Sequence, residues 1–103
     1  SPRELIALVK PQFEVGKEKV GKNGVVRDPK DQAIAIQQVL ETACKLGWSY
    51  QGLTWSPLPG PAGNIEYLLW LKAQDEGEQP TIPDLKTLVQ LTQTARQELG
   101  NQE

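Results

Sequence analysis

The sequence contains no histidine and a single cysteine, Cys44, among its 103 residues. These absences exclude catalytic arrangements that need a histidine base, zinc sites built from several cysteines, and an intrachain disulfide. A chain without disulfides fits a cytoplasmic protein. We expect Cys44 to pack on a helix as a small apolar side chain. No metal site is predicted from the side chains of this chain.

Long apolar runs are also missing. No stretch approaches the ~20 residues needed to cross a bilayer, and no secretory signal is visible at the start of the chain. The helix expected at 29–46 has neither the basic polar face nor the bulky apolar face of a surface-active helix. We therefore expect no membrane partner.

Positive charge is scarce overall and concentrated in one stretch. The net charge of −2 argues against a globally basic nucleic-acid-binding protein. Residues 10–30 carry six basic and three acidic side chains, whereas residues 31–103 carry four basic and nine acidic ones. Two interpretations of this basic loop stay open, a solvated surface loop and a contact with a polyanion.

A continuous apolar run, Leu5 to Val9, ends at Lys10 and Pro11. Such a run predicts a strand over residues 4–10 that is buried on both faces, as in parallel sheets. Ligand sites in open α/β sheets lie beyond the carboxyl ends of such strands, which makes Lys10 a candidate functional residue. Because a natural chain rarely opens with its central strand, we expect a piece of a longer protein.

The middle of the chain predicts a loop followed by a helix. Glycines and lysines punctuate residues 11–27, which indicates a long loop. Asp28 and Pro29 are typical of a helix start, and Gly47 is typical of a left-handed stop. Apolar residues recur at helical spacing between these signals, so we predict a helix over 29–46 with one buried face.

Two strands and a last helix are expected after this helix. Residues 48–55 and 65–72 are rich in aromatic and branched side chains, and a Pro- and Gly-rich turn joins them, which predicts an antiparallel hairpin. An acidic linker at 74–80 and a helix at 81–100 follow. The fold class is therefore α/β, in the order strand, helix, strand, strand, with a C-terminal helix.

Glu66 is the acidic residue within the otherwise apolar strand expected at 65–72. If this strand runs antiparallel beside the strand at 4–10, its start lies near the end of that strand. Lys10 and Glu66 then meet at one edge of the sheet. The residues alone leave two interpretations, an ion pair between strands or an amine base with a carboxylate partner.

Several motifs stand in a characteristic order along the chain. They are Leu8-Val9-Lys10-Pro11-Gln12-Phe13-Glu14, Gly16-Lys17, Gly24-Val25-Val26-Arg27-Asp28-Pro29, Ser56-Pro57 and Gly60-Pro61-x-Gly63-Asn64-x-Glu66. With these motifs, residues 5–72 resemble the C-terminal half of the TlyA-type (haemolysin A) family of FtsJ-like RNA 2′-O-methyltransferases.

The resemblance implies a Lys-Asp-Lys-Glu tetrad, of which Lys10 matches the second lysine and Glu66 the glutamate. It implies that Lys10 helps to deprotonate a ribose 2′-hydroxyl, which attacks the methyl group of S-adenosyl-L-methionine, while Glu66 holds the lysines. It also implies a Rossmann-like sheet that is mostly parallel with one antiparallel strand. The RNA-binding residues that it implies are Lys17, Lys19, Lys22 and Arg27.

The family's Gly-rich cofactor loop and the other two tetrad residues have no counterpart here, and no Gly-x-Gly-x-x-Gly follows a strand. We therefore expect residues 1–73 to be the C-terminal part of a methyltransferase domain that holds no cofactor-binding residues. The complete protein would be an S-adenosyl-L-methionine-dependent rRNA 2′-O-ribose methyltransferase, and this piece alone would be inactive. The alternative is a non-catalytic RNA-binding or protein-assembly module.

A sheet cut before its first strand has an exposed edge. We expect this edge either to mediate self-association or to be covered by the C-terminal helix.

Overall fold

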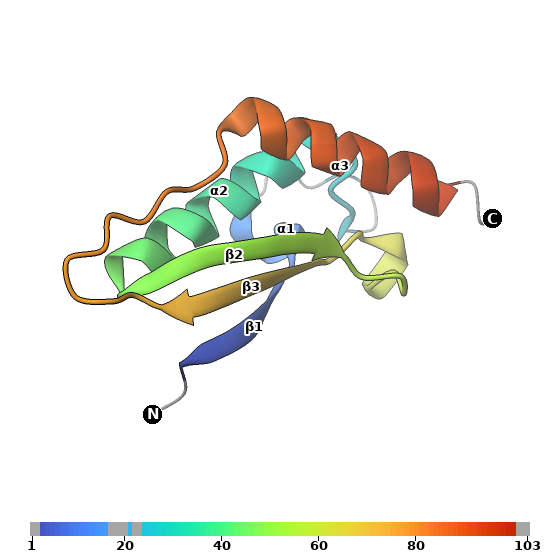
Figure 1. Ribbon diagram of the computed structural model, residues 1–103. Coiled ribbons are helices and arrows are strands. Elements are labelled where there is room, and N and C mark those ends of the chain that lie inside the picture. The colour runs from blue at the N-terminus through green and yellow to red at the C-terminus, as the bar shows by residue number, and fades with distance from the viewer. Residues whose placement is uncertain (1–2, 17–20, 22–23, 101–103) are drawn as a thin grey trace.

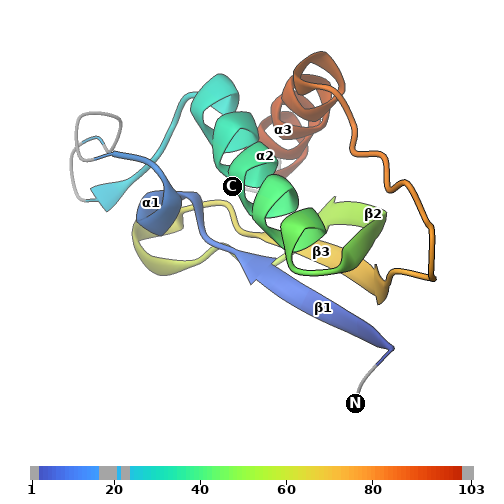
Figure 2. The same cartoon turned by 90° about the vertical axis from the view of Figure 1, so that its left-hand side faces the viewer.

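The computed structural model describes residues 3–16, 21 and 24–100, and it forms three layers (Figure 1). A three-stranded sheet is covered on one face by α2, and α3 packs on the outer side of α2 (Figures 1 and 2). In chain order the elements are β1 (Glu4–Val9), α1 (Pro11–Glu14), α2 (Pro29–Lys45), β2 (Trp48–Trp55), the 3₁₀ turn η3 (Pro61–Gly63), β3 (Tyr67–Ala73) and α3 (Leu85–Gly100).

The strand order is β1-β3-β2, so the last strand in the sequence lies at the centre of the sheet. β3 pairs antiparallel with both neighbours, which confirms the predicted hairpin of β2 and β3. β1 and β2 run in the same direction but do not pair, because β3 lies between them. A mostly parallel sheet is therefore not seen within the described residues, where both pairings are antiparallel.

Helix α2 follows the prediction closely because its end signals are local. The Asp28 side chain accepts a hydrogen bond from the Lys30 backbone N–H at 2.9 Å, and Pro29 occupies the first turn. Gly47 follows the helix with a φ of +96°, which a residue with a side chain rarely adopts. The apolar face of α2 packs on the sheet and supplies Ala33, Ile36, Leu40 and Ala43 to the core.

The predicted burial of the first strand on both faces is wrong for the described chain. Burial alternates along β1, and Val9 is buried whereas Ile6 is 62% exposed. Trp70, the partner of Ile6 on β3, is 44% exposed on the same face. The physical reason is that helices cover only one side of this sheet. The expectation that the C-terminal helix covers β1 is also wrong, because α3 packs along α2 instead (Figure 2).

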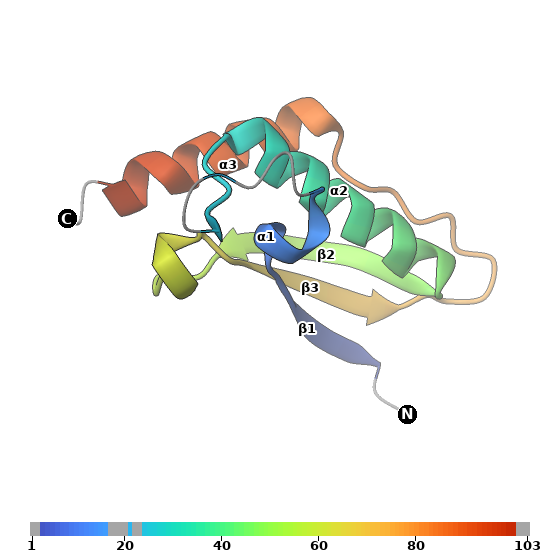
Figure 3. The same cartoon turned by 180° about the vertical axis from the view of Figure 1, so that it is seen from behind.

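The segment predicted as loop 11–27 begins with a single helical turn, α1, between the end of β1 and α2 (Figure 3). Pro11 is buried and suits the first helical position, and its carbonyl accepts a hydrogen bond from the Val15 N–H at 3.1 Å. This turn holds the residues that follow Lys10 in a fixed conformation.

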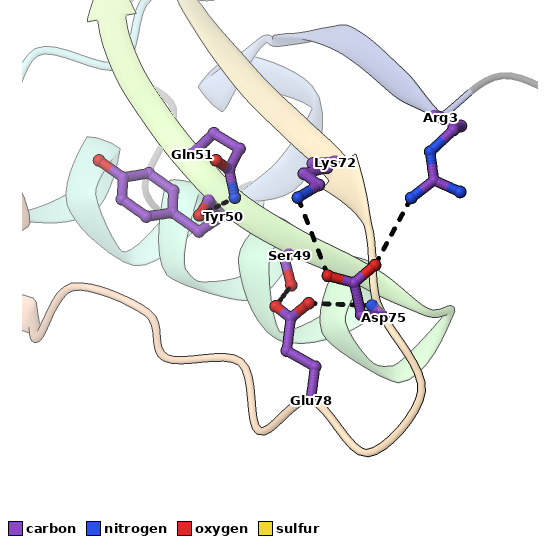
Figure 4. A network of polar contacts seen from close by, with 7 residues as sticks. All are labelled: Arg3, Ser49, Tyr50, Gln51, Lys72, Asp75 and Glu78. Carbon is purple, nitrogen blue, oxygen red and sulfur yellow. Dashed lines mark hydrogen bonds and ion pairs between the residues drawn. The ribbon is translucent and has the colours of Figure 1, made fainter.

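The acidic segment after β3 folds back onto the sheet (Figure 4). The Ser49 hydroxyl donates to a Glu78 carboxylate oxygen, and the Asp75 backbone N–H donates to the other oxygen at 2.9 Å. Arg3 and Lys72 lie 3.5 and 3.9 Å from the Asp75 carboxylate. The hydrogen bond from Ser49, then that from the Asp75 backbone, lowers the pKa of Glu78 below its ordinary value.

Helix α3 begins at Leu85, later than the predicted residue 81, because Asp84 caps it. The Asp84 carboxylate accepts a hydrogen bond from the Thr87 backbone N–H at 2.8 Å, which lowers the pKa of this group. Leu88 and Ala95 are buried against the core. Within the described segments, no helix is long and apolar enough to cross a membrane.

Candidate functional site

The register of β1 and β3 brings Lys10 and Glu66 to one edge of the sheet. Val9 at the end of β1 pairs with Tyr67 at the start of β3. Lys10 follows Val9 and Glu66 precedes Tyr67. In an antiparallel pair, the two residues therefore lie together one position beyond this last pair. This edge is the one that the sequence pattern predicted, although β3 begins one residue after Glu66 and not before it.

Glu66 is an unusual acidic residue because its side chain is only 8% exposed. Its Oε2 atom is buried and has no hydrogen-bond partner among the residues that the structure describes. The side chain lies directly over Gly60, where an added Cβ would collide with the carboxylate. Gly60 is itself held by a hydrogen bond from its N–H to the Asn64 carbonyl at 2.7 Å. The Glu66 carboxylate is therefore enclosed by the turn that precedes it.

Lys10 is half-buried and leads directly into α1. Its Nζ lies 6.0 Å from the centre of the Phe13 ring, and its carbonyl accepts a hydrogen bond from the Phe13 N–H at 2.9 Å. Phe13 is 73% exposed, so this contact lies at the surface and contributes about 0.5–1 kcal/mol at most. Lys10 and Glu66, both described by the structure, make no ion pair with each other. A simple inter-strand salt bridge is therefore not the arrangement seen.

Of the residues expected to bind RNA, only Arg27 is described. Its side chain is exposed, and its carbonyl accepts a hydrogen bond from Arg96 Nη1 at 3.1 Å. Lys17, Lys19 and Lys22 lie outside the described residues.

Sequence reasoning did not single out the buried polar residues beside this edge. Tyr67 is fully buried, and its hydroxyl donates to Gln32 Oε1 at 2.7 Å. Burial raises the pKa of the Tyr67 phenol above its ordinary range. Asn64 is also buried and bonds to the segment before α2. The burial of Gln32 could have been predicted from the sequence. It lies four residues before Ile36, which places it on the buried stripe of α2.

At this edge the Glu66 side chain lies against Gly60 of the Gly-rich turn before β3, so the protein's own side chain occupies the space beside this glycine.

The family model described as FtsJ-like methyltransferase matches residues 1–73, and the chain belongs to this family.

Two curated relatives extend this result. The 16S/23S rRNA (cytidine-2′-O)-methyltransferase TlyA of Mycobacterium tuberculosis strain H37Rv is 52% identical over 73 residues, which cover 71% of this chain and 27% of the relative. The 23S rRNA (cytidine-2′-O)-methyltransferase TlyA of Campylobacter jejuni is 43% identical over 70 residues, 66% of this chain and 27% of the relative. The chain thus spans about a quarter of the length of the curated relatives that it matches.

A solved structure from Streptococcus thermophilus, classed with the hemolysins, superposes with a TM-score of 0.84 at 34% sequence identity. The match covers 96% of this chain and 34% of that one. Because 96% of the chain includes most of α3, the three-layer arrangement of the sheet and both long helices is shared with that structure.

Proposed function

We propose that this chain is the C-terminal part of an rRNA 2′-O-ribose methyltransferase that uses S-adenosyl-L-methionine. The single observation that supports this most strongly is the register, which puts Lys10 and Glu66 together one position beyond the Val9–Tyr67 pair. The relatives named as rRNA cytidine-2′-O-methyltransferases supply the substrate class. An enzyme that acts on rRNA works in the cytoplasm of a bacterium, and the proposal includes this location.

In this proposal Lys10 takes part in removing the proton of the ribose 2′-hydroxyl. In the proposal Glu66 holds the amines at the site: its buried Oε2 atom, which has no donor among the described residues, would accept a hydrogen bond from a further lysine outside this chain. Arg27, together with Lys17, Lys19 and Lys22, would contact RNA phosphates. The methyl group comes from the cofactor, which residues outside this chain would bind.

The decisive experiment replaces Lys10 in the complete protein. Lys10→Ala should abolish transfer of a radiolabelled methyl group to rRNA, by about 10²-fold or more, because it removes the proton acceptor and leaves the strand intact. Lys72→Ala is the matched control: it removes another half-buried lysine, at the opposite end of β3, and should keep activity. Normal turnover of Lys10→Ala would refute the role.

This chain by itself should neither bind S-adenosyl-L-methionine nor transfer methyl groups. Isothermal titration with the cofactor tests this directly, and a saturable signal in the micromolar range would contradict it. The alternative, a non-catalytic RNA-binding or assembly module, would gain support if the complete protein carried no Gly-rich loop after an upstream strand.

A further inference from the structure

A buried amide holds the segment Gly24–Asp28, which carries Arg27, against the turn before β3. Asn64 is 2% exposed. Its Oδ1 accepts a hydrogen bond from the Val26 N–H at 3.0 Å, and its Nδ2 donates to the Gly24 carbonyl at 2.8 Å. One side chain thus pairs with a backbone donor and a backbone acceptor of the same segment, in the way that a neighbouring strand would.

A second amide completes this attachment. Gln32 of α2 donates from Nε2 to the Val26 carbonyl at 2.9 Å and accepts at Oε1 from the Tyr67 hydroxyl. Both backbone groups of Val26 are therefore bonded to buried side-chain amides, and the Val26 side chain is itself buried. Since unpaired polar groups in such a place are costly, the segment has one favoured position.

The same short stretch of chain serves the site and the attachment. Asn64 lies two residues before Glu66. Tyr67 directly follows Glu66 and pairs with Val9. The position of Arg27 is therefore tied to the edge that carries Lys10 and Glu66 through side chains next to that edge.

We propose that Asn64 is a positioning residue for RNA, which sets where Arg27 meets a phosphate relative to the ribose beside Lys10. This inference rests on the proposed function and deepens it, because it assigns substrate placement to a buried side chain that does not touch the substrate. Phosphate contacts set the register of a nucleic acid, so a shift of this segment would weaken binding and misplace the reacting hydroxyl.

The first experiment needs no RNA. Hydrogen exchange of the Val26 amide is measured in this chain and in Asn64→Ala, which loses both bonds, and Asn64→Asp, which keeps the acceptor for Val26. Asn64→Ala should speed exchange about ten-fold relative to the Leu40 amide in α2, whereas Asn64→Asp, which also loses the donor to the Gly24 carbonyl, should lie between Asn64→Ala and wild type. Unchanged exchange in Asn64→Ala would overturn the attachment.

Gln74→Ala is the matched control. Gln74 is another amide with two backbone partners, the carbonyls of Cys44 and Trp48 at 3.0 and 2.8 Å, but it is half-buried and lies at the opposite end of the sheet. Its loss should leave the Val26 exchange unchanged. If Asn64→Ala does not fold, Gln32→Glu replaces it, because this change removes the donor to Val26 and keeps an acceptor for Tyr67.

The second experiment measures binding of transcribed rRNA and methylation kinetics in the complete protein. Asn64→Ala should raise the Kd and the KM for rRNA about ten-fold and lower the slope of log Kd against log salt by about 1, as expected for one lost phosphate contact. Asn64→Asp should lie between Asn64→Ala and wild type, and Gln74→Ala should match wild type.

The outcomes distinguish failure of the positioning role of Asn64 from failure of the proposed function. Asn64→Ala could bind rRNA with wild-type affinity and salt dependence although its Val26 amide exchanges faster. The Asn64 side chain would then be purely structural, and only the positioning role would be overturned. A wild-type protein that bound no rRNA would overturn the proposed function and this inference with it.

Discussion

Glu66 is the residue whose surroundings least resemble those of an ordinary acidic side chain. It is buried, its Oε2 atom has no donor within the described part of the chain, and Gly60 leaves just enough room for it. An unsatisfied polar atom in such a place reduces the stability of the folded chain. Proteins retain such a cost where activity requires it, so Glu66 should show opposite effects on stability and on function.

Glu66→Gln tests this directly. The neutral amide has nearly the same shape and removes the buried charge, so we expect this chain to gain about 1 kcal/mol in its free energy of unfolding. In the complete protein the same change should reduce methyl transfer strongly, because a neutral side chain no longer holds the amines. Urea unfolding and a methylation assay measure the two effects.

Glu76→Gln serves as the comparison, since Glu76 is exposed and should give no change in either assay. A destabilised Glu66→Gln chain with full activity in the complete protein would contradict the prediction on both counts.

At the scale of elements, the acidic segment and α3 depend on two carboxylates. The pKa values of Glu78 and Asp84 are both lowered by hydrogen bonds, from Ser49 and from the Thr87 backbone respectively. A lowered folded-state pKa means that the stabilisation is present above the unfolded-state pKa, about 4, and is lost as the pH falls through the folded value.

We therefore expect α3 to loosen on acidification below about pH 4. Amide exchange in α3, corrected for the intrinsic rate, should accelerate several-fold relative to that in α2. Asp84→Asn keeps a capping side chain that does not titrate, so it should preserve α3 at neutral pH and reduce this acid effect. An α3 that loosens equally in Asp84→Asn and wild type would show that another group is responsible.

The elements also show which parts of the fold the sequence could predict. α2 and β2 were predictable because Asp28, Pro29 and Gly47 act on their immediate neighbours. The central position of β3 could be stated only as a condition, because strand order depends on contacts between distant residues. The open face of β1 was missed because apolar side chains such as Ile6 look the same in sequence whether or not a layer covers them.

The candidate site divides in the same way. Lys10 and Glu66 could be named from their positions at the ends of apolar runs, and the register places both at one edge. The roles of Asn64 and Gln32 could not be predicted, since Asn64 bonds to backbone groups 38 and 40 residues away and Gln32 accepts from the Tyr67 hydroxyl 35 residues away. A pattern of residue types carries no signal for such bonds.

For the molecule as a whole, the uncovered face of the sheet is the main liability. Ile6, Leu8 and Trp70 are exposed on a surface that also borders the free edge of β1. Such an edge favours association with another chain. In a protein as long as the relatives, additional chain would be available to cover it.

We expect this chain alone to self-associate, and Ile6→Lys to weaken the association about ten-fold or more by placing a charge on the apolar face. Leu58→Lys is the control, because Leu58 is 77% exposed but lies in the turn between β2 and η3. Sedimentation over a range of concentrations measures both variants. A strictly monomeric wild-type chain would contradict the prediction.

The central place of β3 also has a consequence for synthesis on the ribosome. β1 and β2 emerge first, yet each has β3 as its neighbour in the sheet. Neither strand can pair as it does in the finished sheet until Ala73 has left the exit tunnel, so nascent chains halted earlier hold two unpaired apolar strands that chaperones must shield. The edge with Lys10 and Glu66 is likewise assembled only once β3 is available.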